Sequence, residues 1–593
     1  MKSLICMLMT LCLATSLSAQ DVADQVAPEA QGAGVMTGSA QVIAAQDAKE
    51  SNRPIDAQTW MVAAANPHAV EAGAEVLRAG GTAADAMVAV QAMLGLVEPQ
   101  SSGLGGGAFL VWYDAASGEL TTLDGRETAP LAATPRLFQD DQGEPLGFFD
   151  AVVGGRSVGT PGTPALMQAA HQRWGKADWP VLFADAILLA ENGFKVSPRM
   201  AMLVAGDADR LSRQQAAREY FLPGDVPVTA GSLLKNPAYA ATLRQLAKDG
   251  AGVFYTGDIA TDIVETVQGA DSNPGVLAPV DLAIYQIKER DAVCVDYRSH
   301  QVCGMGPPSS GALTVGQILG LVEPFDIAAM GPDSPEAWRL IGDASRLGFA
   351  DRARYMADSD FVPVPSKGLL DRAYLTERST LLQGEMALVE VKPGKPDFDH
   401  ALNWADDVAI ELPSTSHISI VDSYGNALSM TTTIENGFGS RLMVRGFLLN
   451  NELTDFSFRS HFDGVPVANR VEPGKRPRSS MAPTIVLKDG KPVLVVGSPG
   501  GSRIIGYVAK TIIAHLDWGM DVQAAVSLPH LVNRFGTYDV EEGTKAEALT
   551  APLEAMGFEV SVRALTSGLH AISLGETLQG GADPRREGIA LGD

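Results

Sequence analysis

The pattern of hydrophobic and polar positions predicts a largely helical chain up to about residue 400. Residues 67–79 and 82–96 carry apolar residues at helical spacing, with Pro67 and Thr82 as starting signals. Alternating residues over 109–113 predict a strand after the two helices. From 160 to 400 the pattern is again mostly helical, between loops rich in Gly, Pro and Asp.

After Pro413 the pattern changes to short alternating strands. Residues 417–422 and 427–434 alternate on either side of a turn at 424–426. Further elements are predicted as strands at 446–449, 484–487 and 493–496 and as a helix over 502–517. There are few alternations of strand and helix, and no internal repeat of solenoid length. This pattern favours an α+β fold of stacked sheet and helix layers over a doubly wound sheet.

The first residues are typical of an export signal. Lys2 forms a short positive region, residues 4–14 are apolar, and small residues precede a cleavage point near residue 19. Such a stretch is too short to span a bilayer, so we predict a cleaved signal peptide over 1–19, with an uncleaved anchor as the alternative. Residues 20–58 show no apolar period and are predicted to be a flexible leader. We therefore expect a soluble protein that is secreted or periplasmic.

Loss of the signal peptide would leave two cysteines, Cys294 and Cys303. A two-residue turn at 298–299 would place them opposite each other in a strand hairpin, where Cβ atoms lie within disulfide range. An oxidising compartment permits the bond. The sequence leaves open both a disulfide and two free buried thiols, and neither version is catalytic.

Composition and motif searches exclude several classes of function. The 593 residues are 46% hydrophobic and 19% charged, which is a globular balance. The formal net charge of −25 argues against nucleic-acid and membrane-surface partners. The glycine-rich segment 101–107 lacks the Walker lysine and follows a helix, so its glycines are expected to let backbone segments pass closely rather than to bind phosphate. The histidines lie at no zinc spacing and no GxSxG elbow is present, so neither a metal nor a serine hydrolase is expected.

The segment PSTSHISIVD places Thr415 at the start of a predicted strand, which on its own is typical of an ordinary strand residue. Ten motifs in one order give it a context: NPHAVEAG, SSGLGGG, DGRETAP, VGTPG, PPSSGA, TSH, NNELTDF, RPRSSM, GSPGGSR and ADPR. In this combination the chain resembles the γ-glutamyltransferases, a branch of the N-terminal-nucleophile hydrolases. The resemblance covers residues 61–588.

The resemblance implies a four-layer αββα sandwich built from two chains of one precursor. Family members cut themselves before a threonine, here between Ser414 and Thr415. The products would be a large subunit, 59–414, and a small subunit, 415–593, which together form a heterodimer. The freed α-amine of Thr415 would have an unperturbed pKa of about 7.7–8.0 and can activate the adjacent hydroxyl.

Further positions match catalytic residues of the family. Thr433 matches a second threonine that orients the nucleophile by hydrogen bonding. Gly500 and Gly501 match the pair whose backbone N–H groups face the developing oxyanion, an interaction typically worth about 3 kcal/mol per donor.

A γ-glutamyl group ends in an α-carboxylate and an α-ammonium, so its pocket needs both signs of charge. Arg126 matches the carboxylate-binding arginine, whose planar fork fits a carboxylate. A matching serine pair, Ser479 and Ser480, adds hydroxyl donors. The acceptors that match the ammonium site are Asp455, Glu452 and Glu435.

Several positions depart from the family pattern. Ser416 stands in place of a common Thr and keeps the hydroxyl. Glu435 and Glu452 stand where some members carry Asn and Gln. Arg478 stands where many members have Leu, which leaves the donor or acceptor open. Residues 458–474 occupy the place of a covering loop, and the sequence does not show whether it closes.

The resemblance implies a cofactor-free γ-glutamyltransferase and glutathione hydrolase. Thr415 would form a γ-glutamyl ester from glutathione and other γ-glutamyl compounds, and water or an amino acid or dipeptide acceptor would resolve it. One alternative is a glutaryl-type β-lactam side-chain acylase of the same superfamily, against which Asp455 and Glu452 argue. Another is an inactive periplasmic relative, against which the presence of Thr415 and Thr433 argues.

Overall fold

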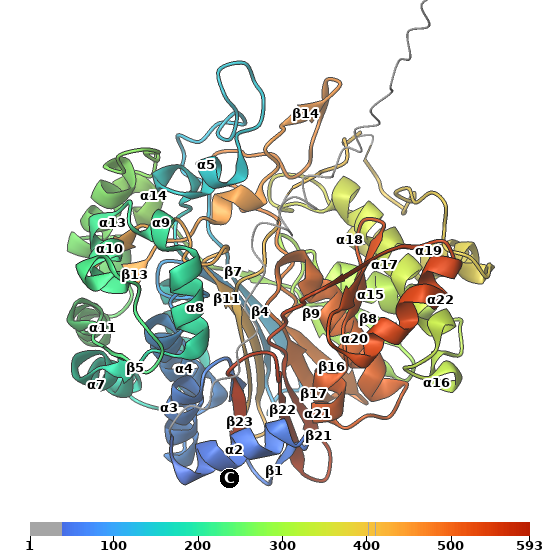
Figure 1. Cartoon of the computed structure of the whole chain (residues 1–593), viewed down its shortest axis with the longest axis horizontal. Coiled ribbons are helices and arrows are strands. Elements are labelled where there is room, and N and C mark those ends of the chain that lie inside the picture. Colours follow the sequence, from blue (N-terminus) through green and yellow to red (C-terminus); the bar gives the residue numbers. More distant parts are fainter. Residues whose placement is uncertain (1–37, 401–402, 410) are drawn as a thin grey trace, which may run out of the picture.

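Two stacked sheets form the centre of the molecule (Figure 1). The computed structural model describes residues 38–400, 403–409 and 411–593, and within them each of these sheets has seven strands. The first sheet runs through β1 (Ile55–Ala57), β22 (Leu578–Ala582), β21 (His570–Leu574), β17 (Lys491–Gly497), β16 (Thr484–Lys488), β9 (His300–Gly304) and β8 (Val293–Tyr297). The second runs through β23 (Ile589–Gly592), β2 (Met61–Ala64), β10 (Ser416–Val421), β11 (Ala427–Thr433), β3 (Gly107–Tyr113), β4 (Leu120–Gly125) and β7 (Lys288–Arg290).

Helices cover the outer face of each sheet. The second sheet is covered by α3 (Pro67–Arg78) and α4 (Ala83–Val97), and the first by α15 (Gly311–Val322), α17 (Pro335–Tyr355) and α20 (Ile504–Leu516) (Figure 1). Further helices are α6 (Thr163–Trp174), α7 (Ala184–Asn192), α8 (Pro198–Gly206), α10 (Gln215–Phe221), α11 (Pro237–Asp249), α13 (Asp258–Gln268), α19 (Arg372–Ser379), α21 (Val522–Ser527) and α22 (Thr550–Ala555). No helix among the described residues is long and apolar enough to cross a membrane.

Alternation along the strands divides the apolar side chains between layers. Met61 and Ala63 of β2 pack into the cluster between the two sheets, whereas Val62 and Ala64 pack against the covering helices. Because successive side chains of a strand point to opposite faces, one buried strand serves two cores. The order helix, sheet, sheet, helix confirms the predicted αββα sandwich.

Several local predictions are confirmed. Thr82 caps α4 through a capping box with Asp85, and the strands β10 and β11 pair around the predicted turn. In the β8–β9 hairpin, Cys294 lies opposite Cys303 and the two form a disulfide, so the structure selects one of the two alternatives. The predicted strand at 446–449 is shorter, as β13 (Phe447–Leu448).

The flexible leader is a wrong prediction for residues 38–58, the part of it that the structure describes. Residues Ala40–Glu50 form α2 and residues Ile55–Ala57 form β1. The inward face of α2 consists largely of Val42, two alanines and the stem of Lys49, all buried. Alanine gives little contrast between the two faces of a helix, so the apolar period was too weak to see. The predicted signal peptide lies outside the described residues.

Candidate active site

The residues singled out from the sequence converge on one cavity. Its lining is Arg126, Glu411, Leu412, Thr415, Thr433, Glu435, Glu452, Asp455, Ser479, Ser480, Met481, Gly501 and Ile504. They come from the ends of β4, β10 and β11, from a short 3-10 turn over Glu452–Asp455, and from the loops before β16 and α20. Ser414 and Gly500 are each one residue away from a lining residue.

Strand register brings the two threonines together. Ser416 of β10 lies opposite Thr432 of β11, so Thr415 and Thr433 meet one step further along the ladder. The hydroxyl of Thr415 donates to Oγ1 of Thr433 at 2.9 Å, and the backbone N–H of Glu435 donates to the same oxygen at 2.8 Å. Thr433 therefore holds the Thr415 hydroxyl in one orientation.

The glycine-rich segment 101–107 packs against this strand pair, as expected of closely passing backbones. A Cβ atom on Gly106 would collide with the backbone carbonyl oxygen of Thr433, and one on Gly105 would collide with that of Leu448. Its glycines therefore serve close packing beside the site.

A backbone N–H group faces the carbonyl that precedes Thr415. The N–H of Gly500 donates to the carbonyl oxygen of Ser414 at 3.3 Å. Gly500 has φ +134°, and a Cβ there would lie 2.7 Å from the ring of Tyr507. Gly501 has φ +57°, and its Cβ would lie 2.8 Å from the carbonyl group of Leu412. Both positions thus require glycine. The N–H of Gly500 polarises the Ser414 carbonyl.

Thr415 itself has a strained backbone. Its φ is +96°, a region that β-branched residues rarely adopt and that costs on the order of 1–3 kcal/mol. Besides the contacts already described, Arg586 Nη1 donates to the Thr415 carbonyl oxygen at 3.0 Å. The φ torsion is defined by the carbonyl carbon of Ser414, so cleavage of the bond between them removes this strain.

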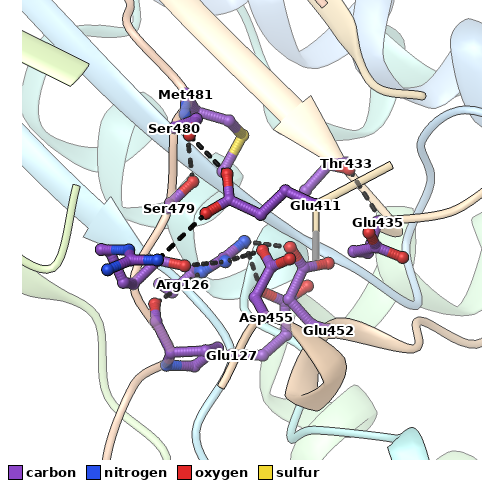
Figure 2. A network of polar contacts seen from close by, with 12 residues as sticks. Arg126, Glu127, Glu411, Thr433, Glu435, Glu452, Asp455, Ser479, Ser480 and Met481 are labelled. Carbon is purple, nitrogen blue, oxygen red and sulfur yellow. Dashed lines mark hydrogen bonds and ion pairs between the residues drawn. The ribbon is translucent and has the colours of Figure 1, made fainter. Parts of the chain in front are cut away.

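One wall of the cavity is acidic (Figure 2). The buried guanidinium of Arg126 donates to Glu452 and Asp455, and also to the carbonyl oxygens of Pro477 and Arg478 at 3.2 and 3.0 Å. The Arg126 guanidinium, which is predicted to bind a substrate carboxylate, thus binds two protein carboxyls in the uncleaved chain.

These carboxyls are crowded. Burial raises the pKa values of Glu435, Glu452 and Asp455, and repulsion among these carboxyls adds to the effect for Glu435 and Asp455. The neighbouring Glu127 is fully buried, and burial followed by Glu452 raises its pKa as well. A cation entering this wall would relieve the repulsion.

The other wall contains residues that the motifs did not indicate. The carboxylate of Glu411 accepts from Ser480 Oγ (Figure 2). It also accepts from the guanidinium of Arg352, whose Nη2 donates to Ser480 Oγ at 2.8 Å as well. Arg478 pairs with Asp407 at 2.8 Å and lies 3.6 Å from Glu411. Burial would raise the pKa of Glu411, but Arg352 and Arg478 outweigh it and hold the pKa below its usual value.

Sequence reasoning missed Glu411, Arg352, Glu127 and Arg586. Arg352 is distant from Thr415 along the chain and stands in no quoted motif. Glu127 lies inside DGRETAP, Glu411 lies three residues before Ser414, and Arg586 directly follows ADPR, so proximity to a motif was the available signal for these three. Among the described residues, no cluster of three or more His, Cys, Asp or Glu side chains is arranged to hold a metal ion.

Comparison with known proteins agrees with this geometry. The family model described as Gamma-glutamyltranspeptidase matches residues 69–593. The chain is 38% identical over 546 residues to the glutathione hydrolase proenzyme of Bacillus subtilis (strain 168), covering 90% of this chain and 91% of the relative.

Solved structures give the same picture. A cephalosporin acylase from Bacillus halodurans matches with a TM-score of 0.81 at 26% identity, over 91% of this chain and 97% of that one. The Helicobacter pylori γ-glutamyltranspeptidase matches with a TM-score of 0.55 at 35% identity, over 57% of this chain and 96% of that one. With a family model that spans nearly the whole chain, this protein belongs to the γ-glutamyltranspeptidase family.

Proposed function

We propose that this chain is the precursor of a γ-glutamyltransferase and glutathione hydrolase that cuts itself between Ser414 and Thr415. The observation that carries the proposal is the pairing of a hydroxyl oriented by Thr433 with a carbonyl polarised by Gly500 N–H. The name of the Bacillus subtilis relative, a proenzyme, supports the same reading.

Self-cleavage would proceed through an N-to-O acyl shift. Thr415 Oγ1 attacks the carbonyl carbon of Ser414, the oxyanion develops at the Gly500 N–H, and the C–N bond breaks as the nitrogen takes up the hydroxyl proton. Water then hydrolyses the ester. The products are a carboxylate on Ser414 and a free α-amine beside the hydroxyl of Thr415, and the strained φ no longer exists.

Turnover uses that amine as a base. It takes the proton of Thr415 Oγ1 as the oxygen attacks the γ-carbonyl of the donor, and the proton leaves with the amine product. The resulting γ-glutamyl ester is resolved by water, which gives glutamate, or by the amine of an amino acid or dipeptide acceptor, which gives a new γ-glutamyl amide. Gly500 and Gly501 would stabilise the oxyanion in both steps.

The cavity offers both charges that a γ-glutamyl group needs. Asp455, Glu452 and Glu435 would accept from the α-ammonium, and Ser479, Ser480 and Arg126 would bind the α-carboxylate. In the uncleaved chain the carboxylate of Glu411 already lies on Ser480. Residues before Ser414 must therefore move aside before a donor can bind.

The two products of cleavage would stay together as a heterodimer. β10, which follows Thr415, pairs with β2 from the large part and β11 from the small part. This central position in one sheet supports subunits 59–414 and 415–593 that share a core. With the predicted signal peptide over 1–19, we further propose that the enzyme is secreted or periplasmic.

Thr415→Ala tests the proposal. On a denaturing gel the wild type is expected to give two bands and the variant one band at the precursor's size, with no hydrolysis of γ-glutamyl anilide. A wild-type protein that stays a single band would contradict self-cleavage.

The likeness to the Bacillus halodurans cephalosporin acylase favours one second candidate, an acylase for glutaryl side chains. A glutaryl group lacks the α-ammonium that the acidic wall can hold. We therefore expect the cleaved enzyme to prefer γ-glutamyl over glutaryl anilide by more than about tenfold, since one charge-assisted hydrogen bond contributes about 1.5–3 kcal/mol. Preference for the glutaryl anilide would reverse the assignment.

A further inference from the structure

We propose that Lys49 of α2 is a positioning residue for Thr415 and that it acts through Arg586. The inference rests on the proposed function, because it concerns the geometry of the nucleophile in cleavage and turnover. Lys49 lies on α2, the first described helix, and contacts the segment just before β23, the last strand. The two elements lie at the same end of the molecule in Figure 1.

Lys49 fixes a short segment just before β23. Its side chain is 7% exposed, and Nζ donates to the carbonyl oxygens of Arg586 and Gly588 at 2.9 and 2.7 Å. These two carbonyls flank Glu587, so one ammonium group sets the course of the whole segment 586–588. Gly588 packs closely against His570, because a Cβ atom at this position would collide with the ring of His570.

Arg586 connects this segment to Thr415, the proposed nucleophile. Its guanidinium is fully buried and donates to the Thr415 carbonyl oxygen at 3.0 Å. Before cleavage Thr415 is also restrained by its peptide bond to Ser414. After cleavage that restraint is gone, so the Arg586 contact and the Thr433 hydroxyl, together with the peptide bond to Ser416 of β10, orient the new N-terminal residue.

A second set of contacts joins the same segment to the residue after Thr415. Glu587 accepts from the backbone N–H of Arg199 at 3.1 Å, and Arg199 lies 3.7 Å from Glu98. Glu98 in turn accepts from the hydroxyl of Ser416 at 3.3 Å. The segment held by Lys49 thus reaches both Thr415 and Ser416.

The test compares Lys49→Met with wild type and with Lys248→Met, a control that removes an exposed lysine on α11. Self-cleavage half-time is measured on the gel, and kcat and KM on the cleaved enzyme with γ-glutamyl anilide. We expect Lys49→Met to lower kcat by about tenfold or more with KM within about twofold, since small misplacements of a reacting group can cost about a hundredfold. Lys49→Arg, which keeps the donors, is expected to restore much of kcat.

Arg586→Met and the double variant test the route. If Lys49 acts through Arg586, adding Lys49→Met to Arg586→Met should change kcat by less than about twofold, because the link is already broken. Unchanged kcat in folded Lys49→Met, or multiplicative effects in the double variant, would overturn the inference. If Lys49→Met does not fold, Lys49→Leu, which likewise removes every donor, is judged by the same criterion.

The two proposals fail in different ways. A wild-type chain that neither cuts itself nor hydrolyses γ-glutamyl anilide refutes the proposed function. A wild type that does both, beside a Lys49→Met variant with the same cleavage half-time and kcat, refutes only the role of Lys49.

Discussion

The two sides of the bond between Ser414 and Thr415 are held by different kinds of interaction. On the Thr415 side, every residue of β10 is buried, and the strand pairs with β11 along its length and with β2 over Ile418–Val421. Ile418 and Ile420 pack under the covering helices. This side is fixed by a backbone ladder and by apolar burial, neither of which depends on the bond to Ser414.

On the Ser414 side, residues 403–409 and 411–414 lie outside the helices and strands. Ion pairs hold them: Asp406 with Arg354, Asp407 with Arg478, and Glu411 with Arg352. Glu411, Leu412 and Ser414 are nevertheless buried, whereas Asn403, Asp406 and Val408 further from the bond are exposed.

The difference shows which part of the site can move. A buried ion pair gains little over its solvated partners, because desolvation offsets most of the attraction. Once its end is cut, such a segment has no strand pairing to retain it, whereas the strand that begins after the proposed nucleophile stays. The precursor can therefore fill its own pocket without permanently blocking it.

Gly501→Ala is expected to have the largest effect on self-cleavage. The new Cβ would lie 2.8 Å from the Leu412 carbonyl group, and φ +57° disfavours any side chain. The segment before the bond would be pushed away from the oxyanion site, so we expect self-cleavage to slow by about a hundredfold or more, the scale of losing an oxyanion donor. A time course on a denaturing gel measures this.

Gly437→Ala is the control, because nothing lies within 4 Å of the Cβ atom it would add. Cleavage of Gly501→Ala at the wild-type rate would show that the close contact with Leu412 is not needed for processing.

Glu411→Gln should slow self-cleavage without changing turnover by the cleaved enzyme. The neutral side chain leaves Arg352 without its charge partner, so the segment before Ser414 is less well held and cleavage should slow by about tenfold. Because the residues after Thr415 are untouched, kcat per cleaved molecule should equal that of the wild type. Gel densitometry and active-site titration give the two quantities, and an equal fall in both would contradict the division into two sides.

The strands and the threonine pair could be predicted from the sequence because their causes are local or repeated. Alternation fixed β10 and β11, and their register alone brings Thr415 opposite Thr433. The disulfide followed from the same reasoning, with its oxidation left open. Motif order then supplied the predicted roles of Arg126 and Asp455, which no spacing rule would have given.

What could not be predicted depends on contacts between distant segments. The helix α2 is stabilised by its place against the last strand, and its alanine-rich inner face shows no period. Glu411 is an ordinary acidic residue in the sequence, and its position on Ser480 depends on Arg352 and Arg478 being buried beside it. Long-range electrostatic partners of this kind are visible only in the folded chain.

The smallest expected effect is a change in the pH dependence of stability at Glu435, which contacts residues on both sides of the bond between Ser414 and Thr415. Its N–H donates to Thr433 and its carboxyl accepts from Leu412 N–H at 3.4 Å. Because burial, then Asp455 and Glu452, raise its pKa, the folded chain holds a proton that the unfolded chain releases near pH 4.5. Stability from this group is therefore complete below the unfolded pKa and is lost as the pH rises through the folded pKa.

Comparing Thr415→Ala with Thr415→Ala/Glu435→Gln isolates this contribution in an uncleaved chain. The parent should lose thermal stability as the pH rises above about 4.5, the unfolded pKa, and the double variant should lose less, by about 1.4 kcal/mol for each unit of raised pKa. Glu50→Gln in the same background, an exposed glutamate of α2, should leave the slope unchanged. Identical slopes for all three proteins would mean that Glu435 is already ionised in the folded precursor, so that the acidic wall carries its full charge before any donor arrives.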